Sequence, residues 1–103
     1  MIPSMDIRPD QQARIDDICR RYGVRRLDLF GSAAVGSERI DSDVDLLVDF
    51  IPGQAPSAFR LVDMQEELEQ VFPGRRIDLA FPAMLRNPYR RRIVESQRRP
   101  LFA

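Results

Sequence analysis

Three aspartates lie within or next to apolar runs, where a charged side chain is unexpected. Each is therefore a candidate for a functional role. Asp43 and Asp45 flank the start of the run Val44–Phe50, and Asp78 lies inside a later run. Side chains two apart on a strand project from one face, about 7 Å apart along the backbone. Such a pair repels by about 1 kcal/mol in water and about 4 kcal/mol when half-buried. A cation removes that cost, and carboxylate oxygens suit Mg²⁺, so the pair predicts a magnesium site.

A Gly-Ser step closes the preceding apolar run. Gly31 allows a sharp backbone turn, and Ser32 offers a hydroxyl and an N–H group to a phosphate. Alone, Gly-Ser is usually an ordinary turn, and Asp-x-Asp is usually solvated. Their combination at the ends of consecutive strand-like runs favours Mg²⁺-dependent chemistry on a nucleotide.

Asp78 would supply the third carboxylate. From an adjacent strand it could complete a second metal position and orient or deprotonate an attacking hydroxyl, and two metals about 4 Å apart stabilise both oxygens of an in-line displacement. The alternative is that Asp78 faces solvent on an edge strand. Asp41, in the loop, and Asp49, solvated at a strand end, are interpreted as bystanders, and Asp28 is expected on the solvent-facing side of the sheet.

The composition limits the chemistry further. The chain has 103 residues, a formal charge of zero and no histidine, and all sixteen of its cationic side chains are arginine. Histidine acid–base catalysis, a Ser-His-Asp triad and histidine-ligated zinc are therefore excluded. The single cysteine, Cys19, is expected to be a buried thiol. No apolar run is long enough to span a bilayer and no secretory signal is evident, which favours the cytoplasm.

The periodicity predicts one α+β domain over residues 1–103, a small mixed β-sheet with helices packed on it. Helices are predicted over 9–22, 57–72 and 88–97, and strands over 24–30, 43–50, 75–81 and 101–102.

The pattern Gly31-Ser32-x10-Asp43-x-Asp45 resembles the signature of the minimal nucleotidyltransferases of the DNA polymerase β superfamily. The likeness extends over nearly the whole chain, including 22–27 and 74–79. It implies the polymerase β-like fold, two Mg²⁺ ions, and ATP as substrate. It also implies a prokaryotic antitoxin that forms a hetero-oligomer with a HEPN-domain ribonuclease toxin and transfers AMP to a toxin tyrosine.

The same resemblance assigns roles to individual residues. Gly31 and Ser32 would hold phosphate, Asp43 and Asp45 would bind metal, and Asp78 would be the third catalytic and metal-binding carboxylate. Many members of this family have an arginine in the turn after the serine. This chain has Val35 there, which cannot grip phosphate as a guanidinium does.

Two alternatives stay open. The chain could silence its partner by contact alone, because its C-terminal part is rich in arginine, a residue enriched at interfaces. It could also transfer a nucleotide to a small molecule, although such enzymes generally carry an additional acceptor-binding domain. Direct nucleic-acid binding is not expected, since net charge is zero and basic and aromatic residues do not interleave.

Overall fold

The computed structural model describes residues 7–30 and 44–103. In chain order its elements are α1 (Pro9–Arg21), β1 (Val24–Phe30), β2 (Val44–Phe50), α3 (Ala58–Val71), β3 (Ile77–Ala80), η1 (Pro82–Leu85), α4 (Pro88–Gln97) and β4 (Arg99–Phe102). The helices and strands lie where the sequence predicts them, with small differences at the ends. The short 3-10 helix η1 was not predicted. No helix in the described ranges is long and apolar enough to cross a membrane.

The four strands form one mixed sheet in the order β3-β2-β1-β4. β1 runs antiparallel to β2 and to β4, and β2 runs parallel to β3. The predicted C-terminal strand is longer than expected, and it forms the sheet edge beside β1. Pro100 lies inside it, and an edge strand tolerates a residue that cannot donate a ladder hydrogen bond.

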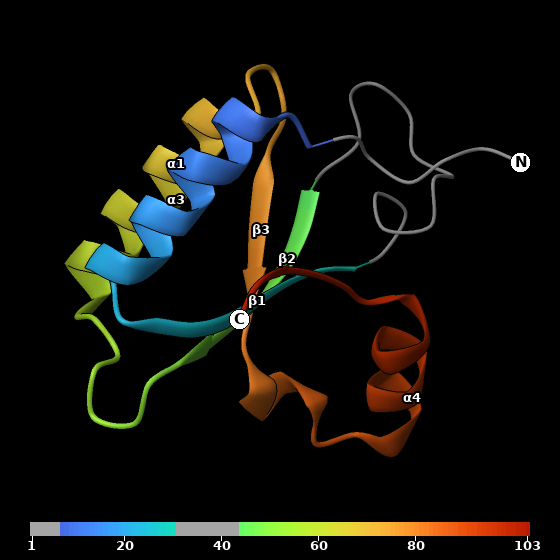
Figure 1. Ribbon diagram of the computed structural model, residues 1–103. Helices are drawn as coiled ribbons and strands as arrows, with labels where there is room; N and C mark the ends of the chain where they lie inside the picture. Colours follow the sequence, from blue (N-terminus) through green and yellow to red (C-terminus); the bar gives the residue numbers. More distant parts are fainter. Residues whose placement is uncertain (1–6, 31–43) are drawn as a thin grey trace, which may run out of the picture.

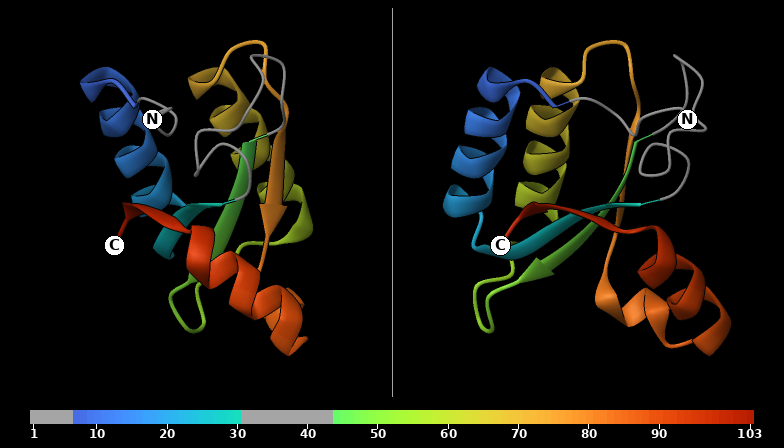
Figure 2. Two further views of the ribbon diagram at one scale, coloured as in Figure 1. Left: turned by 90° about the vertical axis from the view of Figure 1, so that its right-hand side faces the viewer. Right: turned by 45° about the vertical axis from the view of Figure 1, so that its right-hand side comes forward.

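The two long helices cover one face of the sheet, and α4 lies on the other side (Figures 1 and 2). Between the sheet and the long helices lies the buried core, because alternate strand residues point toward α1 and α3. Its fully buried large side chains are Ile15, Leu27, Leu29, Val44, Leu46, Val48, Met64, Leu68, Val71 and Ile77.

Local signals explain where the two long helices begin and what they bury. Pro9 stands in the first turn of α1, and the Ser57 side chain caps α3 by accepting a hydrogen bond from the Arg60 backbone N–H at 3.4 Å.

Cys19 is buried, as predicted, and burial raises the pKa of its thiol to about 12. It therefore stays protonated at physiological pH and acts as a small apolar group.

Gly23, between α1 and β1, has a positive φ of 71° and no room for a side chain. A Cβ there would lie 2.9 Å from the Gln54 Cβ, whereas a Cβ on Gly53, with φ at 80°, would meet nothing within 4 Å. We expect Gly53→Ala to lower the free energy of unfolding by about 1 kcal/mol, the cost of placing an alanine in the left-handed backbone conformation. Gly23→Ala should cost more, about 2–3 kcal/mol, because strain and collision combine. Urea unfolding measures both, and equal losses would contradict the role given to the collision.

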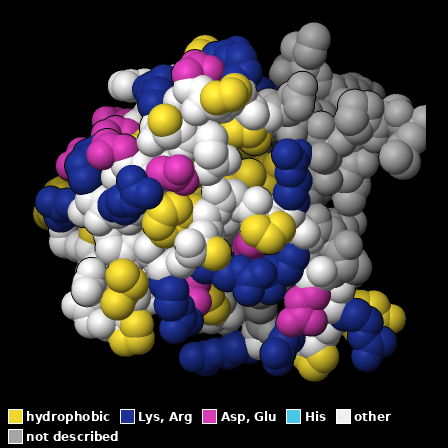
Figure 3. All heavy atoms as spheres, in the orientation of Figure 1, with side chains coloured by type: hydrophobic (Ala, Val, Ile, Leu, Met, Phe, Trp, Pro, Cys, Tyr) yellow, Lys and Arg dark blue, Asp and Glu magenta, His cyan; other side chains and the backbone are white. Residues whose placement is uncertain are grey.

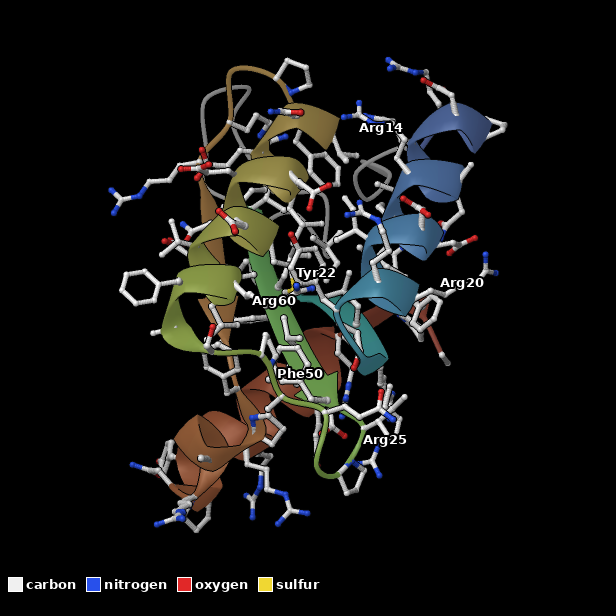
Figure 4. All side chains as sticks on the ribbon, turned by 90° about the vertical axis from the view of Figure 1, so that its left-hand side faces the viewer. Arg14, Arg20, Tyr22, Arg25, Phe50 and Arg60 are labelled. Carbon is white, nitrogen blue, oxygen red and sulfur yellow. The ribbon has the colours of Figure 1, made fainter. Side chains whose placement is uncertain are left out.

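Glu67 ties α3 to the end of α1. It accepts hydrogen bonds from the Tyr22 hydroxyl at 2.5 Å and from Arg21 Nη2 at 2.5 Å. The Arg60 guanidinium lies 4.9 Å from the Tyr22 ring centroid, and Figure 4 shows these two side chains meeting between the helices. The hydrogen bonds from Arg21, and next from Tyr22, lower the pKa of Glu67 from its usual 4.5.

This pKa shift predicts a pH dependence of stability. Because the folded-state pKa is depressed, the contribution of Glu67 is present above pH 4.5 and is lost as pH falls through the folded value. Glu67→Gln should therefore lower stability at pH 7 and flatten the acid side of the stability curve. Thermal melts from pH 2 to 7 measure this, with exposed Glu66→Gln as the matched control. An unchanged acid limb in the Glu67 variant would contradict the assignment.

Candidate active site

Asp45 and Asp78 lie side by side on neighbouring parallel strands. The register of β2 and β3 pairs them directly, so their side chains project from the same face. That face is the one opposite α1 and α3, because the flanking residues Val44 and Leu46 are completely buried in the core. The two carboxylates, which come from separate segments of the chain, therefore meet on the face that α4 overlooks.

The Asp78 carboxylate of this pair is only weakly neutralised by its surroundings. The Asp78 side chain is 47% exposed, and its ion pair, Oδ1 to Arg76 Nε at 3.8 Å, is itself exposed. Such a surface pair contributes at most about 1 kcal/mol. Two adjacent carboxylates present hard oxygen donors in an arrangement that suits a divalent cation such as Mg²⁺. The chemistry of this donor pair therefore fits the predicted metal.

Two of the five predicted site residues are thus brought together. Gly31, Ser32 and Asp43 lie outside the described residues. Their neighbours in the chain are informative, since Phe30, the last residue of β1, pairs with Asp45. The described part of the site is the acid pair at the junction of β1, β2 and β3.

The prediction that Asp28 faces solvent was wrong. It does lie on the face opposite the core, but it is fully buried and holds two arginines. Arg26 Nε and Arg98 Nε each lie 3.0 Å from Asp28 Oδ2. Asp28 lies on the central strand β1, where it pairs with Leu47 of β2 on one side and with β4 on the other. Arg98, the residue just before β4, covers it.

A cavity of about 410 Å³ continues from this cluster on the same face, and we call it the α4 cavity. It is lined by Arg26, Asp28, Leu47, Asp49, Pro82, Arg86, Arg91, Glu95 and Arg98. Its residue Leu47 lies two positions after Asp45, so the cavity begins about 7 Å along β2 from the acid pair. Asp49, interpreted from sequence as a solvated bystander, is 31% exposed and ion-paired with Arg25.

Sequence reasoning missed the α4 cavity. One available signal was the charge of Asp28 between two leucines in a strand, since a charge is rarely buried without a partner. A second was the cluster of arginines in the C-terminal segment, which could supply that partner. Neither signal says which arginine folds back, because that depends on the long-range pairing of β4 with β1.

Comparison with known proteins gives this geometry its context. The sequence model described as "Nucleotidyltransferase domain" matches residues 14–101. Protein adenylyltransferase MntA of Thermococcus cleftensis is 38% identical over 71 residues, which are 69% of each chain.

Solved structures share the fold of this chain. A structure described as a minimal nucleotidyltransferase superposes with a TM-score of 0.69 at 33% identity, covering 88% of both chains. A crystal structure of a toxin–antitoxin with AMP-PNP gives a TM-score of 0.64 at 17% identity, over 89% of this chain and 73% of that one, which shows a shared fold. The small mixed sheet and the resemblance drawn from the signature are both confirmed, and the chain belongs to the nucleotidyltransferase domain family.

Proposed function

We propose that this protein is an antitoxin that transfers AMP from ATP to a tyrosine hydroxyl of a HEPN-domain ribonuclease toxin. The observation that carries the proposal is the direct pairing of Asp45 with Asp78 across β2 and β3. The name of the Thermococcus relative, protein adenylyltransferase, supports the transfer of AMP. The toxin–antitoxin structure with AMP-PNP supports a nucleotide and a protein partner.

In the proposed reaction the acceptor hydroxyl oxygen forms a bond to the α-phosphorus of ATP. The bond from that phosphorus to the oxygen bridging to the β-phosphate breaks, and pyrophosphate leaves. Asp78, half-exposed beside Asp45, would receive the hydroxyl proton and release it to solvent. Gly31 and Ser32 would hold the phosphate tail.

Asp43, Asp45 and Asp78 are the residues that would hold Mg²⁺, two ions in this proposal. Bound there, the ions would neutralise charge on the phosphates and on the departing oxygen. The remaining contribution of the chain is positioning, which β2 and β3 supply because both strands are anchored in the core.

The test is incubation of the protein with ATP, Mg²⁺ and the protein encoded by the neighbouring gene. Intact-mass spectrometry should find the partner heavier by one AMP residue per transfer, and fragmentation should place it on a tyrosine. A partner of unchanged mass would overturn the proposal.

The second candidate is neutralisation by contact alone, and one observation favours it. The outer side of α4 presents exposed Tyr89 and Arg92, side chains typical of protein interfaces. Figure 3 shows arginines gathered over this part of the molecule. If Asp45→Asn still protected cells from the toxin while Arg92→Glu did not, contact would be the function and transfer would not.

A further inference from the structure

The α4 cavity carries more positive charge than its own carboxylates neutralise. Four of its nine lining residues are arginines and three are carboxylates. One of those carboxylates, Asp49, is ion-paired with Arg25, which lies outside the lining. The four lining arginines therefore face two remaining carboxylates. The cavity is suited to a ligand with negative charge.

The surplus charge can be located. Asp28 is shared by Arg26 and Arg98, and Arg91 Nε lies 3.2 Å from Glu95 Oε1. Arg86 is exposed at the cavity, and it forms no ion pair within the described ranges. A guanidinium presents a planar fork of donors that matches a carboxylate or a phosphate.

The position of the cavity distinguishes between those two anions. Phe30, the last residue of β1, pairs with Asp45, and Asp28 pairs with Leu47, so the cavity begins two residues along the strands from the acid pair. The proposed phosphate-binding residues follow Phe30 in the chain, whereas the cavity begins at Asp28 and Leu47. An in-line displacement places the attacking oxygen opposite the leaving group. The acceptor should therefore approach from the side of the cavity.

We propose that the α4 cavity is the acceptor-recognition subsite and that it takes an acidic side chain of the acceptor polypeptide close to the modified hydroxyl. This inference rests on the proposed transfer to a protein. Arg86 is its principal contact and pairs with the incoming carboxylate, while the buried cluster around Asp28 fixes the cavity floor. Recognition by charge also selects among exposed hydroxyls, which are otherwise chemically alike.

The test is direct binding of a probe to the full chain. The probe is a fluorescein-labelled nonapeptide with a central tyrosine flanked by glutamates, and its control has glutamine at each glutamate. Fluorescence anisotropy should show that the glutamate peptide binds and that the glutamine peptide binds roughly tenfold more weakly, as for loss of a charge-assisted hydrogen bond. Arg86→Gln should weaken binding of the glutamate peptide by about the same factor.

Arg20→Gln is the matched control, because it removes the same charge as Arg86→Gln at an exposed residue of α1 that does not line the cavity. We expect it to change affinity by less than about twofold. Saturating Mg²⁺-ATP should leave the peptide bound. No binding of the glutamate peptide, equal losses in both arginine variants, or displacement by Mg²⁺-ATP would each overturn the subsite.

This assay separates the subsite from the proposed function. The comparison of the two peptides and of the arginine variants is made without ATP, so it does not depend on transfer. A partner that gains AMP while the peptide fails to bind would overturn the subsite and leave adenylyl transfer standing. If the peptide binds through Arg86 but the partner protein gains no AMP, the subsite stands and the proposed adenylyl transfer is overturned.

Discussion

Asp45→Asn should reduce nucleotidyl transfer by about 1,000-fold, since a metal-held charge contributes several kcal/mol to the transition state and each 1.36 kcal/mol is tenfold in rate. The amide keeps the size of the side chain and removes the charge that, with Asp78, would hold the cation. The rate is measured by following label from α-phosphate-labelled ATP into the partner protein. Asp63→Asn is the control, because Asp63 is an exposed carboxylate on α3, on the far side of the sheet.

A stability measurement separates loss of chemistry from loss of fold. Without divalent cation, the Asp45 variant should stay folded, because the amide keeps the size of the side chain and no longer repels Asp78. Mg²⁺ should raise the melting temperature of the parent and not of the variant, since only a cation that binds the folded state stabilises it. A variant that transfers AMP normally, or that gains the full stabilisation from Mg²⁺, would remove Asp45 from the site.

Asp28→Asn should cost about 3 kcal/mol in the free energy of unfolding, the low end for removing one partner of a buried ion pair. The low end applies because the Arg26 and Arg98 side chains are 43% and 23% exposed, and water can replace part of what they lose. Since the free energy of unfolding of a domain is only about 5–15 kcal/mol, this cost is a large fraction of the total stability.

Urea unfolding measures the effect, and Asp17→Asn provides the comparison. Asp17 accepts from Arg21 Nε at 2.9 Å in an exposed ion pair, so its loss should cost less than about 1 kcal/mol. Similar costs for the two variants would mean that the buried carboxylate contributes no more than a surface one.

Most of the fold follows from local patterns in the sequence. The strand Val24–Phe30 and the start of the helix at Pro88 are predicted to the residue, because each follows a strong signal: Gly23 before the strand, and Asn87 with Pro88 at the helix start. The third strand is shorter than predicted. Its register with β2 begins at Ile77, with Arg76 contributing only a carbonyl that accepts from the Val44 N–H at 2.8 Å, and the chain leaves the sheet before Phe81. Strand ends depend on partners that a single segment does not reveal.

The candidate site, like the fold, can be predicted from the sequence only in part. That Asp45 and Asp78 share a face follows from apolar alternation, which puts Val44 and Leu46 in the core. The environment of Asp28 does not follow from alternation, which gives the face of a side chain and not what covers that face. The covering residue, Arg98, is 70 positions away in sequence.

The segment from η1 through α4 leaves the sheet after β3, at one edge, and returns as β4 at the opposite edge. It crosses the face of the sheet that bears Asp45 and Asp78, and every described side chain of α4 is exposed and lies outside the core. Substitutions along its outer surface should therefore leave folding almost unchanged. Under the proposed function, substitutions along this segment would change which partner docks, while the strands that bear Asp45 and Asp78 would keep the same chemistry.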